Sequence, residues 1–258
     1  MDKEDGLHDD GFVLVRNCLE LIIYSSGKID VDAFANIQFI QKDFRSIERL
    51  FTIEFNRDWN LTNPLGNQSL ISSGLNFNLK KNGFVKYQFE KLDFSETFSG
   101  NKHNVSGLLK HKKSVLNTET SILNSDGSYA ESKFFRTQNQ FKYHFAKNWI
   151  GGSFRHENNK ETLMSTNALS NLSQRFSEVG AFVGRGDSTK VFVELGYLNR
   201  VNDSLQSGFL KKVNQSNSYY LKSQLIKNDQ SNLSVFINYR NLKYEDDREN
   251  EPSLNSRI

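Results

Sequence analysis

The chain has 258 residues, 36% of them hydrophobic, and its mean hydropathy of −0.61 is low for a protein with one large compact core. It carries 33 basic and 30 acidic residues with the two signs mixed along the chain, so no basic patch indicates a nucleic-acid partner. The 21 Phe and 9 Tyr against 2 Pro exclude a disordered chain, and a sheet with one apolar face accounts for both the aromatic content and the low hydropathy.

Cysteine content and hydropathy exclude two further classes. The single cysteine, Cys18, excludes an intrachain disulfide framework and a multi-cysteine metal site, and we expect a small buried or edge residue there. No run of about 18 apolar residues exists, so we expect no transmembrane helix. Residues 1–10 are acidic where a signal peptide has a basic region, so we expect either that the protein stays inside the cell or that Met1 is not the true start.

The first elements follow from the spacing of apolar residues. Residues 12–24 fit a strand or a short helix, and their β-branched content with the following SSGK turn favours the strand. We expect residues 1–27 to be a poorly defined segment with at most one strand, and residues 28–258 to form an antiparallel β meander. Within it, period-two alternation predicts strands over residues 29–39 and 47–59, followed by a loop at Pro64 and Gly66.

Further strands follow to the end of the chain. Residues 71–79 and 85–89 are predicted to pair through KKNG, because Asn82-Gly83 is a strong hairpin signal. Leu92 and Phe94 change parity, which a bulge near Lys91 explains. Alternation, mixed over residues 114–123 and clearer elsewhere, then predicts strands over residues 105–109, 114–123, 129–145, 149–156, 175–184, 190–200, 216–226 and 232–244.

The expected connections alternate in length. Tight joins are predicted at residues 41–46, 80–83, 111–113, 146–148, 186–189 and 227–231. Longer loops are predicted at residues 60–68, 95–102, 124–128, 157–174, 201–215 and from 245 onward. Short turns at one end and long loops at the other are typical of outer-membrane barrels. A strand of eleven residues tilted by about 40° also rises roughly 28 Å, which is close to the height of the apolar band of a bilayer.

The strand count adds an expectation about closure. Twelve strands from residue 28, or thirteen with residues 12–24, do not close as a bacterial barrel, which has an even number of strands and both termini on the periplasmic side. Leu254, Ser256 and Ile258 begin another alternation. We therefore expect a fragment of a larger sheet or barrel, insoluble alone or dependent on detergent or a partner.

The Asn-, Ser-, Lys- and Phe-rich hairpins carry a resemblance. NSYYLKSQLIKN and VFINYRNLKYEDD resemble pieces of the very large outer-membrane β proteins of Bacteroidota. The resemblance is one of style over residues 28–258, implies a location in the cell outer membrane and carries no functional residue across. The acidic start departs from it.

Possible chemical motifs have simpler interpretations. Gly184 to Ser188 reads GRGDS, an integrin-binding core, but this is also good turn sequence between two strands. Acidic residues 245–251 lack the spacing of an EF-hand calcium loop. The histidines, with no ligand-pair spacing, are expected to be scattered on polar faces: His8, His103, His111, His144 and His156. No hydrolase, metalloprotease, phosphate-loop or dinucleotide motif occurs, so we expect no catalytic, metal or cofactor-binding residues, no cofactor and no enzyme activity.

The expected fold is all-β: an antiparallel up-and-down meander of about 12 to 13 long strands, paired with sequence neighbours, as an open or partial barrel. The expected function is a non-enzymatic outer-membrane β-barrel segment, a transport conduit or structural wall, whose partners are the lipid bilayer or the remaining strands of a larger barrel. The alternative is a soluble or surface-attached β-sheet module for binding or adhesion, because alternation alone does not distinguish lipid from protein on the apolar side. A catalytic barrel or hydrolase is the third possibility.

Overall fold

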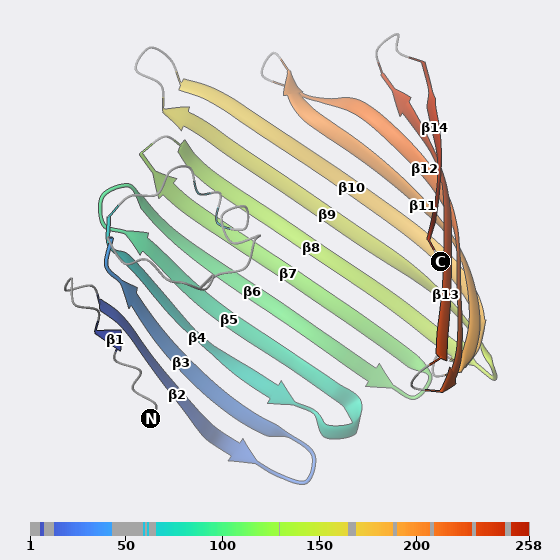
Figure 1. Cartoon of the computed structure of the whole chain (residues 1–258), viewed down its shortest axis with the longest axis horizontal. Helices are drawn as coiled ribbons and strands as arrows, with labels where there is room; N and C mark the ends of the chain where they lie inside the picture. Colours follow the sequence, from blue (N-terminus) through green and yellow to red (C-terminus); the bar gives the residue numbers. More distant parts are fainter. Residues whose placement is uncertain are drawn as a thin grey trace. The chain divides into compact units, whose positions relative to one another are not determined.

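The computed structural model describes residues 6–7, 13–42, 59, 61, 66–128, 130–164, 169–187, 190–206, 209–228, 231–245 and 249–257. In these residues one sheet contains fourteen strands in the order of the sequence, from β1 to β14 (Figure 1). Every pairing with a described register is antiparallel. The all-β, up-and-down, open meander expected from the sequence is therefore confirmed.

Strand bounds in the first part of the sheet are β1 (Gly6–Leu7), β2 (Val13–Ser25), β3 (Asp30–Ile40), β4 (Gln68–Asn78), β5 (Gly83–Phe94), β6 (Phe98–His111) and β7 (Ser114–Gly127). The remainder are β8 (Ala130–Phe145), β9 (Asn148–Met164), β10 (Leu169–Gly186), β11 (Val191–Gln206), β12 (Phe209–Asn228), β13 (Ser231–Tyr244) and β14 (Glu251–Arg257). A 3₁₀ turn, η1 (Lys80–Asn82), joins β4 to β5, and Gly83 after it has a φ of 108°. The predicted KKNG hairpin is confirmed, since a positive φ is readily adopted by glycine.

Two of the expected strands have different outcomes. Residues 12–24 were ambiguous, and β2 confirms their interpretation as a strand. Of the strand expected over 47–59, residues 47–58 lie outside the described residues, but β3 pairs directly with β4, so the place expected for this strand between them was wrong. The expected division of the chain at residue 27 stays a prediction.

The expected alternation of short and long connections was wrong. β9 extends to Met164 and β10 begins at Leu169, while β11 extends to Gln206 and β12 begins at Phe209, so the loops expected at 157–174 and 201–215 are mostly strand. These extensions carry polar side chains on both faces and therefore show no alternation in the sequence. Their backbone groups are nevertheless paired in the sheet, which a polar strand in water permits.

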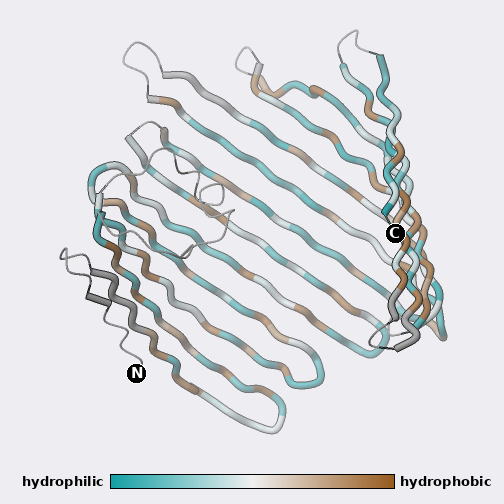
Figure 2. Tube along the Cα trace, in the orientation of Figure 1, coloured by the Kyte–Doolittle hydropathy of each residue, from teal (hydrophilic) through white to brown (hydrophobic). Residues whose placement is uncertain are grey.

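The chain forms two compact units, which are described separately. The first contains Met1–Gly107, Glu119–Phe135 and Asn159–Leu172, and the second contains Leu108–Thr118, Arg136–Asn158 and Ser173–Ile258. Hydrophobic and hydrophilic residues alternate along the strands of each unit (Figure 2). Among the described residues, no helix is long and apolar enough to cross a membrane.

A small core lies in the first unit. Leu92 is 0% exposed and packs with Trp59 and Leu123. The pairing of β5 with β4 is continuous from Phe84 to Phe94, so the bulge expected near Lys91 is absent. Leu92 has instead the same parity as Lys86, and it lies on the mainly polar side of the sheet, where a small apolar cluster covers it.

Candidate functional site

One face of the second unit is apolar and open. Its residues alternate along four paired strands and stand opposite one another in register. We call the following set the apolar face: Val179, Val183, Val193, Leu195, Tyr197, Tyr219, Leu221, Leu225, Leu233, Val235, Ile237 and Tyr239. None of these side chains is charged, although Val179 is 57% and Leu195 is 54% exposed.

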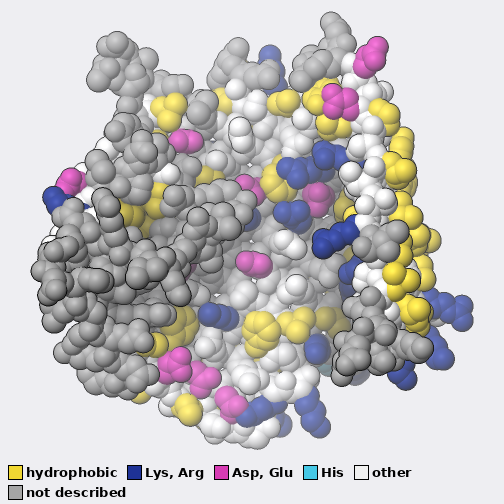
Figure 3. Space-filling model, in the orientation of Figure 1, with side chains coloured by type: hydrophobic (Ala, Val, Ile, Leu, Met, Phe, Trp, Pro, Cys, Tyr) yellow, Lys and Arg dark blue, Asp and Glu magenta, His cyan; other side chains and the backbone are white. Residues whose placement is uncertain are grey.

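The opposite side of the same strands, here called the polar face, is more buried. Glu194 is only 7% exposed and Ser216 only 3%. Lys and Arg side chains gather over β9 to β12 in this unit (Figure 3). The second unit thus exposes apolar side chains on one face, while its other face buries Ser216 and also buries Glu194 beside the apolar cluster of Trp149, Phe182 and Phe192.

Glu194 on β11 joins three other strands of the polar face. Its Oε2 accepts a hydrogen bond from Trp149 Nε1 of β9 at 2.8 Å, and its Oε1 accepts one from the Tyr220 hydroxyl of β12 at 3.2 Å. Lys142 Nζ of β8 lies 3.5 Å from Oε2 and supplies the opposite charge. A buried carboxylate needs such partners, because an unpaired buried charge is costly.

Aromatic rings lie over glycines beside Glu194. A Cβ atom added to Gly184 would stand 2.2 Å from Trp149, and one added to Gly196 would stand 2.2 Å from the ring of Tyr220, its direct cross-strand partner. Both glycines are therefore required by a close approach rather than by a turn. The rings lie close to the backbone at these glycines, and their polar atoms donate to Glu194.

We expect Gly196→Ala to lower the free energy of unfolding by about 1–3 kcal/mol, because its methyl group displaces the Tyr220 ring. Urea unfolding of the detergent-solubilised chain, followed by far-UV circular dichroism, measures the loss. The matched control is Gly27→Ala, whose added methyl group meets nothing within 4 Å. Equal stability of the two variants contradicts the packing described for Gly196.

A basic hollow opens at the turn end of the same strands. It has a volume of about 850 Å³ and is lined by Lys142, His144, Lys147, Trp149 and Lys190, among others. Asp187 is the acidic residue of its lining. The excess of amino groups suits it to negatively charged solutes or counter-ions.

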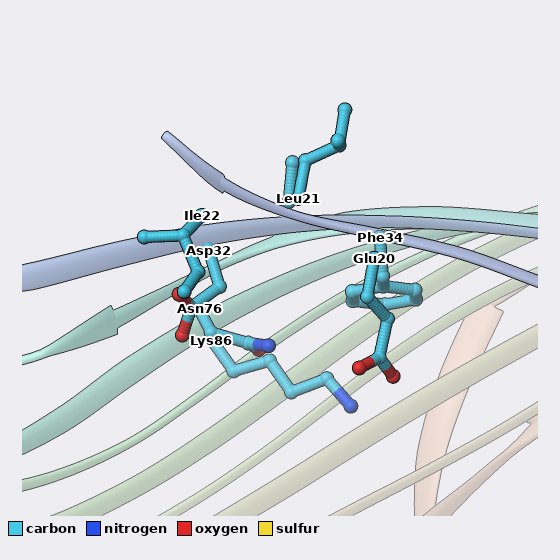
Figure 4. A pocket seen from close by; sticks show the side chains of 8 residues that line it. Glu20, Leu21, Ile22, Asp32, Phe34, Asn76 and Lys86 are labelled. Carbon is cyan, nitrogen blue, oxygen red and sulfur yellow. The ribbon is translucent and has the colours of Figure 1, made fainter. Parts of the chain in front are cut away.

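The first unit has a smaller hollow of about 490 Å³ on its own polar side. Figure 4 shows Glu20, Phe34 and Lys86 on one side of the strands, with Leu21 pointing to the other. Lys86 Nζ lies 5.1 Å from the centre of the Phe34 ring, within the range of a cation–π contact. Acidic, basic and aromatic groups are mixed here, so no single ligand charge is favoured.

An ion pair closes the turn end of the first unit. Lys80 in η1 pairs with Asp30 at the start of β3. Hydrogen bonds from Lys80 and then from Ser25 lower the pKa of Asp30 below its ordinary value. Because Asp30 is on the surface, the pair aligns the two neighbouring hairpins without contributing much to stability.

The structure places the GRGDS motif, three of the histidines and Cys18. Gly184 to Asp187 ends β10 and begins a hairpin turn, in which the Asp187 N–H donates to the Val191 carbonyl, so the turn interpretation is confirmed. His144 lies in the basic hollow. His156 hydrogen-bonds Ser177 and stacks with Phe154 on the side of β9 opposite Trp149. His103 contacts the rings of Tyr87 and Phe89 on the side of β5 opposite Lys86. The polar-face placement was therefore wrong for both His156 and His103. Cys18 is exposed on β2. The short strand β1 pairs only with Val13 and Leu14 of β2, so it does not reach Cys18.

Within the described ranges no three His, Cys, Asp or Glu side chains are grouped to hold a metal ion. Of the acidic run 245–251, residues 246–248 lie outside the described residues, while Glu245 pairs with Lys212 at 2.6 Å and Glu251 accepts a hydrogen bond from Tyr244.

The role of Glu194 was not predicted from the sequence. Its partners lie 45 and 52 residues away in Trp149 and Lys142, and 26 residues away in Tyr220. The only local sign of this role was that Glu194, an acidic residue, lies between Phe192 and Gly196 on the same face of β11. Comparisons with protein-family models, curated proteins and solved structures found no match.

Proposed function

We propose that the chain forms part of the wall of an outer-membrane β-barrel, non-enzymatic, with the apolar face against lipid and the polar face toward an aqueous interior. The observation that supports this proposal is that the apolar Val179 and Leu195 are more than half exposed in the second unit, while the charged Glu194 is buried. Such a wall serves as a transport conduit or as a structural element of a larger barrel.

An apolar surface of this extent calls for a cover. Burying one Val or Leu side chain contributes about 1.5–3 kcal/mol, so leaving a contiguous set of them in water is unfavourable. Large exposed apolar patches mark contacts with protein or membrane. Paired strands also satisfy their own backbone groups, as a hydrocarbon environment requires.

A row of tyrosines favours lipid as the cover. Tyr197 pairs directly with Tyr219, and Tyr219 pairs with Tyr239, so the three rings cross three strands at one level. Two residues further along the same face stand Asn199, Asn217 and Asn241, again paired in register. An apolar band that ends in aromatic residues and then polar ones matches the aromatic girdle of outer-membrane strands.

Spin labels test the lipid contact. In a Cys18→Ser background, a label at Val193→Cys on the apolar face is compared with one at Ser234→Cys, an exposed position of the opposite parity. In lipid vesicles we expect oxygen to relax the Val193 label more than a water-soluble nickel chelate does, and the reverse for Ser234.

The outcome separates the two cover types. A Val193 label that responds mainly to the nickel chelate rejects the membrane proposal. A label shielded from both reagents indicates a protein layer on the apolar face, as a soluble or surface-attached binding module requires.

A further inference from the structure

Three arginines lie near one another on the polar face of the second unit: Arg155 on β9, Arg200 on β11 and Arg240 on β13. The guanidinium carbon of Arg200 is 4.0 Å from the centre of the Phe176 ring, and that of Arg155 is 5.7 Å from it. One ring on β10 therefore supports two cations. Glu178, directly opposite Arg200 on β10, attracts the charge of Arg200, while the charges of Arg155 and Arg240 are close enough to repel it.

Short side chains separate Arg200 from Arg240. On the intervening strand β12, Arg200 stands opposite Ser216 and Arg240 opposite Ser218. The two serines are only 3% and 8% exposed. Strands β11 and β13 are about 10 Å apart across β12. Because the two β12 residues opposite the arginines are serines, neither of them places a long side chain between the guanidinium groups.

Acidic groups neutralise this cluster only in part. Glu178 is shared by two of the three arginines, because its Oε1 lies 3.7 Å from Arg155 Nη1 and it stands directly opposite Arg200. Glu157 is engaged by Arg136 at 3.1 Å. In the part of the chain that the structure describes, neither Arg200 nor Arg240 forms an ion pair, and Arg200 Nε donates to the Asn202 side-chain oxygen at 2.9 Å. The Nε of Arg240 is buried without a hydrogen-bond partner. Two guanidinium groups are thus left with donors for an anion.

We propose that Arg155, Arg200 and Arg240 form a binding site for a phosphate-type oxyanion carried by a solute on the polar face. A guanidinium group offers paired N–H donors that match the oxygens of phosphate, and several such groups together favour a multiply charged anion. Basic side chains on the aqueous side of a barrel wall give selectivity for anions. As a property of a conduit, the site rests on the proposed function.

Inorganic phosphate is the probe. The full chain, solubilised in a phosphate-free maltoside detergent, is titrated calorimetrically with phosphate and, at equal ionic strength, with chloride. We expect saturable binding of phosphate and none of chloride. Arg200→Gln and Arg240→Gln are each expected to weaken phosphate binding about tenfold to hundredfold, the usual effect of losing a charged hydrogen bond.

Arg185→Gln is the matched control, because it removes the same charge from an exposed residue at the turn end of β10, on the parity of the apolar face. It is expected to bind phosphate as the unchanged chain does. If Arg200→Gln loses its strand signal in circular dichroism, Arg200→Lys replaces it, since lysine keeps the charge but not the paired donors.

Absence of saturable phosphate binding, or equal weakening by Arg185→Gln, overturns the site. The assay contains no bilayer, so its failure is distinguishable from failure of the lipid contact. Phosphate binding with a water-exposed label at Val193 rejects only the membrane wall, and a lipid-exposed label without phosphate binding rejects only the arginine site.

Discussion

Replacing Trp149 by alanine is expected to lower the free energy of unfolding by about 3–5 kcal/mol, the largest effect of a single substitution in the second unit. The indole is 6% exposed, packs with Phe182 and Phe192, and lies over Gly184. Its loss leaves a cavity and removes the 2.8 Å hydrogen bond to Glu194. Urea unfolding followed by far-UV circular dichroism measures the change without relying on tryptophan fluorescence.

Trp149→Phe separates packing from the hydrogen bond. Phenylalanine keeps a ring over Gly184 but leaves Glu194 Oε2 without the indole donor, which costs about 1–3 kcal/mol for a buried acceptor. We therefore expect its stability to lie between those of the unchanged chain and Trp149→Ala. A loss below about 1 kcal/mol for Trp149→Ala contradicts the central role assigned to this residue.

Val193→Arg is expected to lower the free energy of unfolding in lipid vesicles by about 2–4 kcal/mol, because it places a charge against the hydrocarbon. Val193 is 43% exposed and stands on the apolar face, with Ser223 opposite it on β12 and Arg185, at the turn end of β10, opposite it on the other side. Reversible urea unfolding from vesicles measures the cost.

The control for this charge lies on the opposite parity. Glu194 is unsuitable because three side chains depend on it. Ser234→Arg adds the same group at an exposed position of β13 and is expected to change stability by less than about 0.5 kcal/mol. Equal losses at Val193 and Ser234 argue against a lipid-facing side.

Strands whose apolar residues all lie on one face were predictable from the sequence. Residues 190–200 and 216–244 show the period-two pattern, and the backbone converts this pattern directly into two faces. The same pattern predicted neighbour pairing, because short connections leave little freedom for other orders. The strand extensions at 157–164 and 201–206 were missed because polar residues stand on both of their faces and their few apolar residues form no clear alternation.

The contacts across the polar face could not be predicted in this way. Glu194 meets Trp149 and Tyr220 because β9, β11 and β12 lie beside one another in space, and no sequence spacing marks that meeting. The same holds for the two arginines that share the ring of Phe176. A change of parity was predicted at Leu92 because an apolar residue was expected to lie on the apolar side of the sheet. Leu92 lies instead on the mainly polar side, where Trp59 and Leu123 bury it.

The strand order has a consequence for the pathway of assembly. Where paired strands are joined by short turns, such as residues 112–113 or 146–147, ring closure costs little chain entropy and contacts are local, which favours fast formation. The pairing of β3 with β4 must instead close residues 41–67. Because Trp59 packs against Leu92 and Leu123, the segment 41–67 can be closed as two shorter segments, one on each side of Trp59. We therefore expect the β3–β4 seam to form last and to be the first to open, with the docking of Trp59 setting how rapidly it closes.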